Sequence, residues 1–230
     1  MAIGNFSASN FISSKSDPCG LNYTAYSWSI WVNFSQTYSV RQTIVCRQRD
    51  GSATNICGYL AWRADGAIEF DDYPPSGGIL ISSVINLVGW HHIAAIRKAV
   101  NPNRRIIVDG TMIGIQDSSE TYSGIVPNNI KVGSAANTSG PSIYGTFFDV
   151  RLYNRTISDG EISALYSSRG RDGITSGLVM RTGIGDGCVG LGSMSGKRIY
   201  DHSPSPLSIS VSGAVSAAVD PFDPFPTEDA

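Results

Sequence analysis

The stretch "GWHHIAAIRKAVNPNRRIIVDGTMIGIQ", residues 89–116, decides the fold. Apolar side chains alternate with other residues along it, and β-branched residues are frequent, which is typical of β-strands. Asp109-Gly110 stands between "RRIIV" and "TMIGIQ". Because both central positions of a type I′ turn need a positive φ, this dipeptide predicts a tight hairpin. The stretch therefore predicts consecutive antiparallel strands.

The two adjacent histidines of this stretch could indicate a metal or proton-transfer site. Adjacent side chains of a strand point to opposite faces, so His91 and His92 cannot both bind one metal from a regular strand. One face carries Trp90, His92, Ala94 and Ile96, and the other carries His91, Ile93 and Ala95. We interpret the pair as part of the sheet architecture, with each histidine hydrogen-bonded within the sheet or between layers.

Similar alternating runs occur along most of the chain, and one segment has helical periodicity. Further predicted strands are 26–34, 42–48, 58–64, 67–71, 129–134 and 145–154. In "SDGEISALYSS", Ser158 and Glu161 have the spacing of a capping box, and an apolar stripe follows at Ile162, Leu165 and Tyr166. The pattern predicts an all-β fold, a two-sheet antiparallel β-sandwich (jelly roll), with one short helix near 158–168.

The order of these segments resembles a known family. "YSWSIWVNF", "QTIVCRQRDG", "GYLAWRADGAIEF", "GWHHIAAIR", "RRIIVDGTMIG", "NNIKVGS" and "GTFFDVRLYNRTISDGEISALY" together resemble the concanavalin A-like, laminin G-like jelly rolls of the lectin/glucanase superfamily. The resemblance covers roughly residues 3–168 and is to a non-catalytic member. It implies function in loops and sheet edges.

The composition changes after about residue 170. We predict a jelly roll over 1–172 and a C-terminal segment over 173–230, which either closes the same sandwich in permuted order or extends from it. The end, "DPFDPFPTEDA" (220–230), predicts an extended tail. Its residues Pro221, Phe222, Pro224 and Phe225 are candidates for docking on a neighbouring subunit.

Bulk composition limits the function classes. Charged residues make up 16% of the chain, and the net charge is −2, so no nucleic-acid partner is expected. The start lacks the features of a signal peptide, and no apolar run reaches the ~20 residues that span a bilayer. These features predict synthesis in the cytosol without membrane insertion. Cys46 and Cys57 flank a predicted hairpin, and they are either free thiols or a disulfide.

Two segments partly match motifs of enzymes. Laminarinase-like relatives carry E-x-D-x-x-E on one strand, whereas this chain has Glu69 and Asp71 but Pro74 in the last position. Retaining hydrolysis needs two carboxylates about 5 Å apart. Gly185, Gly187 and Gly190 match G-x-G-x-x-G, but no helix pattern follows. We therefore expect no cofactor and no enzyme activity.

Binding sites are expected in the loops. Asp71, Asp72, Asp109 and Asp117 could bind calcium, although they lack the D-x-D-x-D-G spacing. Sugar rings could stack on Tyr73, Tyr122 and Tyr144. A basic cluster, formed by Arg97, Lys98, Arg104 and Arg105, is interpreted as a solvated face, with docking to an acidic partner as the alternative.

These observations favour a non-enzymatic structural or interaction protein. We predict a virus or phage particle component, of capsid decoration or fibre-head type, on the virion surface. Its partners would be other protein subunits, including copies of itself. The alternative is a lectin-like module that binds a cell-surface or polymeric glycan, and glycoside hydrolase activity is a distant third.

Overall fold

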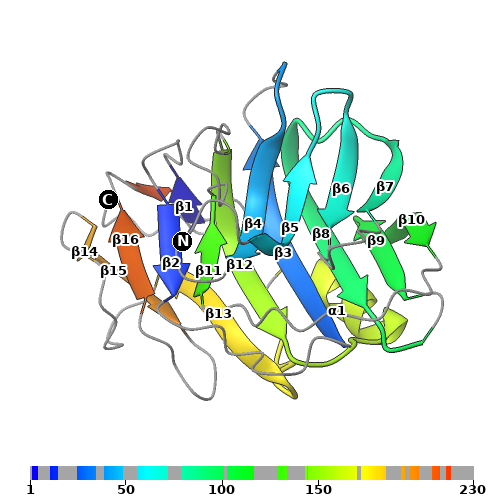
Figure 1. The fold of residues 1–230 in the computed structure, drawn as a ribbon. Helices are drawn as coiled ribbons and strands as arrows, with labels where there is room; N and C mark the ends of the chain where they lie inside the picture. The colour runs from blue at the N-terminus through cyan, green and yellow to red at the C-terminus, as the bar shows by residue number, and fades with distance from the viewer. Residues whose placement is uncertain are drawn as a thin grey trace.

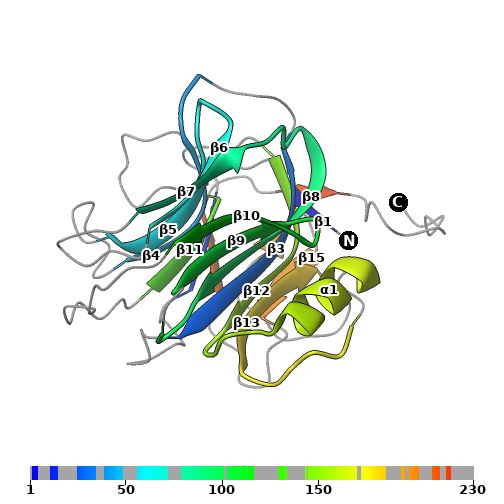
Figure 2. The ribbon, with the colours of Figure 1, turned by 90° about the vertical axis from the view of Figure 1, so that its right-hand side faces the viewer.

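The structure is a computed structural model of the whole chain. The residues it describes are 2–4, 11–14, 25–34, 39–48, 56–71, 79–100, 103–116, 129–133, 143, 145–169, 172–184, 193–194, 197–201, 209–212 and 216–218. Among these residues the strands form two sheets that face each other (Figures 1 and 2). All pairings between the named strands are antiparallel. The predicted all-β sandwich is confirmed.

The larger sheet has ten strands. Its main path runs in the order β10 (Thr111–Gln116), β9 (Arg104–Val108), β8 (Gly89–Arg97), β3 (Tyr26–Phe34), β12 (Gly145–Tyr153), β13 (Leu178–Ile184), β15 (Lys197–Asp201) and β14 (Ser193–Met194). Beside this path, β1 (Ala2–Gly4) pairs with β12 and with β17 (Ser216–Ala218).

The smaller sheet has seven strands. Their order is β16 (Ile209–Ser212), β2 (Phe11–Ser14), β11 (Asn129–Val132), β4 (Gln42–Gln48), β5 (Ile56–Trp62), β6 (Ala67–Asp71) and β7 (Ile79–Val84). Residues after 172 contribute strands to both sheets, since β13 pairs with β12 and β16 pairs with β2. The predicted boundary at residue 172 stays a prediction, and the 220–230 tail lies outside the described residues.

The main core lies between the sheets, and strand β8 shows how alternation builds it. Ile93 and Ala95 belong to the main core cluster. Ala94 and Ile96 belong to a second cluster on the outer face of the ten-stranded sheet. The predicted alternation along the His91–His92 strand is therefore confirmed, but both of its faces are covered.

Helix α1 (Asp159–Ser168) covers part of that outer face (Figure 2). The Ser158 hydroxyl accepts a hydrogen bond from the Glu161 N–H, and the Glu161 carboxylate accepts one from the Ser158 N–H, so the predicted capping box is present. Ile162 and Leu165 are buried in the second cluster with Ile96, Ile107 and Tyr153. An amphipathic face at helical spacing thus seats the helix on the sheet.

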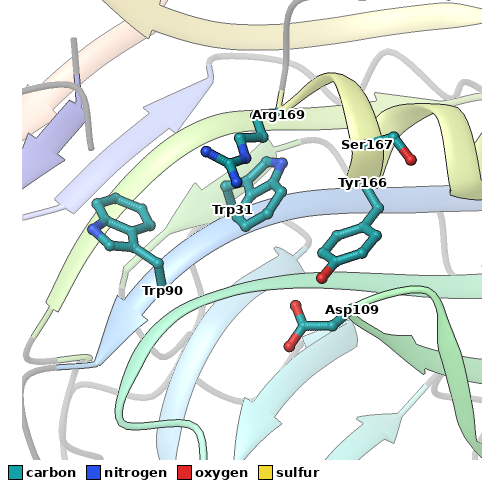
Figure 3. A pocket seen from close by; sticks show the side chains of 6 residues that line it. All are labelled: Trp31, Trp90, Asp109, Tyr166, Ser167 and Arg169. Carbon is teal, nitrogen blue, oxygen red and sulfur yellow. The ribbon is translucent and has the colours of Figure 1, made fainter. Parts of the chain in front are cut away.

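The hairpin between β9 and β10 forms as predicted. Asp109 has φ 50° and Gly110 has φ 77°, the left-handed conformations that a type I′ turn requires. Glycine reaches this conformation without steric cost, and aspartate tolerates it. In Figure 3 the Asp109 carboxylate lies below the Tyr166 hydroxyl.

The expected solvated basic face is wrong for its three arginines. Arg97, Arg104 and Arg105 are only 5%, 0% and 8% exposed. Arg105 shares the helix-covered face with Ile107 and pairs with Asp159 of the helix at 2.6 Å, whereas the alternation of β8 and β9 places Arg97 and Arg104 on the opposite face of the sheet. A charged side chain can be buried when another element supplies its partner, and this partner is 54 residues away in sequence.

Candidate functional site

A pocket of about 300 Å³ opens on the outer face of the ten-stranded sheet, beside the end of helix α1 (Figure 3). Four separate parts of the chain contribute its walls: strands β3 and β8, the β9–β10 turn, and the helix end. The residues that line it are Trp31, Trp90, Asp109, Tyr166, Ser167 and Arg169.

Stacked rings form the base of this pocket. Trp31 is only 4% exposed, and its indole stacks on Tyr166 with centroids 5.8 Å apart and planes 17° apart. The His92 ring centroid lies 5.4 Å from that of Trp31. Trp31 and His92 are direct neighbours across β3 and β8, so the sheet register holds this aromatic base in place.

His92 has a structural role in the base. It is fully buried, and its Nε2 lies 2.9 Å from the Ser29 hydroxyl. Burial lowers the pKa of His92 to about 4, because the charged imidazolium would lose its hydration. The ring is therefore neutral near pH 7, and it supports Trp31 by packing.

Asp109 places a carboxylate on the pocket wall. Its Oδ2 lies 2.7 Å from His91 Nδ1, and its Oδ1 accepts the His92 N–H at 2.9 Å. Burial opposes ionisation, but these hydrogen bonds outweigh it and lower the pKa of Asp109. The hydrogen bond to Asp109 raises the pKa of His91, against the effect of partial burial. Each group thus favours the charged form of the other.

Arg169 completes the pocket at the end of the helix. It is the C-cap residue, in the left-handed conformation (φ 51°, ψ 46°), and its N–H donates to the Tyr166 carbonyl. In Figure 3 its guanidinium reaches across Trp31 toward the side on which Trp90 lies, and the Tyr166 hydroxyl points toward Asp109. The pocket therefore combines aromatic faces, a carboxylate acceptor and a guanidinium donor.

A second polar cluster lies on the outer face of the seven-stranded sheet. The Tyr59 hydroxyl donates to the Glu69 carboxylate, and Arg41 Nη1 donates to the Tyr59 oxygen at 3.0 Å. Arg41 and Arg63 approach Glu69 at 3.4 and 3.6 Å. Burial, followed by the bond to Glu69, raises the pKa of Tyr59 far above its usual value. This phenol stays protonated.

The structure describes only two of the residues proposed for calcium and glycan binding. Asp71 is buried at the end of β6, whereas Asp109 lies on the other sheet. Within the described ranges, no group of three acidic, histidine or cysteine side chains could hold a metal ion. Asp72, Asp117, Tyr73, Tyr122, Tyr144 and the tail residues Pro221, Phe222, Pro224 and Phe225 lie outside these ranges. The calcium, tyrosine and tail sites stay predictions.

The cysteine pair likewise stays a prediction. Cys46 is 1% exposed and lies opposite Tyr59 across β4 and β5. The side chain of Cys57 lies outside the described residues. In the part of the chain that the structure describes, no helix is both long and apolar enough to cross a bilayer.

Sequence reasoning missed most of the pocket. Trp90 was placed on a strand face and Tyr166 on a helix stripe, but neither was assigned to a site. The usable signal was alternation: Trp28 and Trp31 of "YSWSIWVNF" are an odd number of residues apart and so face opposite sides. Trp28 points into the main core, and Trp31 points outward.

Solved structures that share the fold belong to several kinds of protein. A heptameric pentraxin from Limulus polyphemus aligns with a TM-score of 0.56 at 9% identity, over 89% of each chain. Trypanosoma rangeli sialidase aligns with a TM-score of 0.50 at 13% identity, over 64% of this chain and 23% of the sialidase. The receptor binding domain of botulinum neurotoxin type G aligns with a TM-score of 0.50 at 12% identity, over 64% and 38%.

The sialidases correct one prediction. We predicted no enzyme activity, yet part of Trypanosoma rangeli sialidase shares this fold, and the chain spans less than a quarter of the length of that enzyme. The fold therefore gives no reason to exclude enzyme activity. The absence of the second glutamate of the E-x-D-x-x-E motif, where this chain has Pro74, is not sufficient to exclude it either.

The assignment to a family rests on the sequence. No curated protein matches the chain. Residues 7–163 match a family model described as the concanavalin A-like lectin/glucanases superfamily. This match covers the strands that bring Trp31, Trp90 and Asp109 together, and it confirms the resemblance noted in the sequence. The chain belongs to the concanavalin A-like lectin/glucanase superfamily.

Proposed function

We propose that the chain binds carbohydrate in the aromatic pocket at the end of helix α1. The observation that carries the proposal is the stacked Trp31–Tyr166 base beside Trp90, with the Asp109 carboxylate on the same wall. Binding sites for small molecules combine apolar surface with a few well-placed polar groups. Sugars need both, since a pyranose has an apolar face and a rim of hydroxyls.

The pocket geometry suggests how a sugar would be held. The apolar face of the ring packs on the partly exposed Trp90 and Tyr166 rings, while hydroxyls donate to Asp109. Because His91 and the His92 N–H already orient this carboxylate, binding need not order it. The cavity lies at the lower end of the usual range of about 300–1,000 Å³, which suits one or two sugar units.

The comparisons support a binding role in general terms. The superfamily is named for lectins as well as glucanases. One neighbour is called a receptor binding domain, and a sialidase neighbour was solved in complex with sialic acid. These ligands belong to those proteins. The predicted virion or capsid role rests on the sequence alone and stays a prediction.

A glycan array with the full chain tests the proposal, followed by titration of the best ligand. Trp90→Ala should weaken binding roughly tenfold, since stacking on one aromatic ring contributes about 0.5–1.5 kcal/mol beyond the area it buries. Trp90→Phe, the matched control, keeps a ring and most of the affinity. A blank array, or a Trp90→Ala variant that binds as tightly as the wild type, would remove the basis of the proposal.

Assembly is a second candidate function, supported by the two edge strands at one end of the sandwich. Strands β7 ("ILISSV") and β10 ("TMIGIQ") contain no charged residue, although charges are a usual protection of sheet edges. Both strands expose large apolar side chains, namely Ile79, Ile81, Val84, Met112 and Ile115. Measuring the mass in solution tests this: Ile81→Lys with Ile115→Lys should turn an oligomer into a monomer. A monomeric wild type would refute it.

A further inference from the structure

A second pocket, of about 230 Å³, lies on the same outer face of the ten-stranded sheet as the aromatic pocket. One wall is formed by Ile107 and Met112, which are direct neighbours across β9 and β10. The other wall is helix α1, which contributes Asp159, Ile162 and Ser163. The pocket therefore lies between the β9–β10 hairpin and the helix.

The two pockets are neighbours along the helix. Asp109 lines the aromatic pocket, and Gly110, the next residue of the turn, lines the second pocket. A Cβ atom built on Gly110 would lie 3.4 Å from Tyr166 Cδ1, so the partly exposed Tyr166 ring lies against the turn between the pockets. On the helix, Asp159 and Tyr166 are about two turns apart on one side, roughly 10 Å along the axis. A ligand longer than one pocket can occupy both by crossing the edge of Tyr166.

The second pocket combines an apolar floor with an ion pair. Ile107 and Ile162 are buried and form the floor, and the half-exposed Met112 forms an apolar rim. Arg105 Nη1 donates to the Asp159 carboxylate at 2.6 Å. The Arg105 side chain is only 10% exposed, whereas that of Asp159 is 79% exposed. The arginine is thus held by the protein, and the carboxylate is open to a ligand.

This ion pair suits hydroxyl groups better than other ligand groups. Arg105 offers only donors and Asp159 only acceptors, and a sugar hydroxyl can accept from the first and donate to the second. Because the two charges cancel, a charged ligand group would meet a like charge on one side. A wholly apolar ligand would remove water from the pair without replacing its hydrogen bonds. The pocket therefore fits an uncharged sugar unit.

We propose, resting on the carbohydrate-binding function above, that this pocket is a second sugar subsite and that the ligand is an oligosaccharide. The chain runs along helix α1, from the aromatic pocket across Tyr166 to the Arg105–Asp159 pair. One unit lies on Trp90 beside Asp109, and an uncharged unit further along the chain lies on the apolar floor of the second pocket. A monosaccharide fills only one of the two pockets.

Chain length tests this inference on the full protein. The probes are homo-oligomers of glucose, mannose, galactose and N-acetylglucosamine, each from the monosaccharide to the tetramer. In at least one series the tetramer should bind roughly tenfold or more tightly than the monosaccharide, because the first bound unit has already lost the translational freedom that a separate second sugar would lose. A single pocket offered four copies of one unit gains only about fourfold.

Variants of the helix show which pocket is responsible. Ser163→Phe places a ring in the second pocket, so it should reduce the affinity for the tetramer to that for the monosaccharide and leave the monosaccharide unaffected. Ala164→Phe is the matched control, since Ala164 is the next residue of the helix, is exposed and lines neither pocket. Met112→Ser, on the opposite wall, should also weaken binding of the tetramer alone. Far-UV circular dichroism checks that the variants are folded.

The outcomes separate this inference from the proposed function. If the tetramer stays within about fourfold of the monosaccharide in every series that binds, or if Ser163→Phe keeps the gain, the second subsite is overturned while sugar binding in the aromatic pocket stands. If no series binds, this inference is also overturned. A positive glycan array would then still support the proposed function, whereas a blank array would remove both.

Discussion

The two outer faces of the sandwich both bury charged side chains, but they do so differently. Under helix α1, Arg151 is 0% exposed and donates to Asp172 at 2.7 and 2.9 Å and to Asp149 at 2.6 Å. On the seven-stranded sheet, Glu69 is also buried, yet its partners Arg41 and Arg63 have 47% and 34% exposed side chains. The first network is closed within the protein, and the second is open to solvent through its cations.

The comparison shows where rigidity is concentrated. Arg181 also donates to Asp149 at 2.6 Å, and Ser168 at the end of the helix donates to Asp172. The closed network therefore ties strands β12 and β13 to the helix that carries Tyr166 of the pocket. On the opposite face the arginine side chains can move with little loss, because solvent screens them.

Breaking the closed network should have the largest effect. Arg151→Met leaves Asp149 and Asp172 as buried charges without their central partner, and we expect a loss of about 3–5 kcal/mol in the free energy of unfolding. Arg63→Met, its counterpart on the open network, should cost at most about 1 kcal/mol. Urea denaturation of both variants measures the difference. Equal losses would mean that the two faces are energetically alike.

The second largest effect should come from acid, which weakens the closed network. Burial opposes ionisation of Asp172, but hydrogen bonds from Arg151, the Ile174 N–H and Ser168 outweigh it and lower its pKa to about 2. The folded pKa lies below the unfolded value, so this stabilisation is complete above about pH 4 and is lost as the pH falls toward 2, an effect of about 2 kcal/mol.

Denaturation between pH 5 and 2 tests the acid prediction. The wild type should lose more stability over this range than Asp172→Asn, which has no carboxylate to protonate. Asp65→Asn, at a solvent-exposed turn between β5 and β6, is the comparison: the hydrogen bond from Arg63 also lowers the pKa of Asp65, but solvent screens this pair, so the variant should depart from the wild-type curve less than Asp172→Asn does. An Asp172→Asn curve parallel to the wild type would show that Asp172 does not contribute to the acid dependence.

The smallest effect is expected on the open network. Tyr59→Phe removes the hydroxyl that donates to Glu69 and accepts from Arg41. Arg41 is half exposed and already lies 3.4 Å from Glu69, so this ion pair remains and the loss should be about 1 kcal/mol. Thermal unfolding measures this loss of stability for Tyr59→Phe and, for comparison, for Tyr153→Phe, which removes a hydroxyl from the closed network. A loss for Tyr59→Phe as large as that for Arg151→Met would contradict the distinction between the two faces.

Local patterns in the sequence predicted the elements that depend on neighbouring residues. The Asp109-Gly110 turn and the Ser158–Glu161 capping box need only a few adjacent positions, and the alternation through His91 and His92 needs one strand. Each was found where it was predicted. These features depend on backbone geometry and periodicity, which a single sequence displays.

Features that depend on contacts between residues far apart in the sequence could not be predicted from local patterns. Arg105 is buried because Asp159 of the helix pairs with it, and Arg151 is buried because Asp172 does. The pocket is similar, since Trp31 meets Tyr166 only after β3 and the helix pack together. Asp109 was singled out from the sequence as a cation ligand, but nothing local indicated the aromatic rings beside it.

The position of strand β2 has a consequence for how the chain folds. This strand lies between β16 and β11, and its register pairs Ile12 with Val211 on one side and with Val132 on the other. During synthesis β2 is made about 200 residues before β16, so it cannot gain both neighbours until residue 212 has been made. Because a loop of about 200 residues must close before these contacts form, folding should be slow, and the sheet completes only after residues 209–212 have been made.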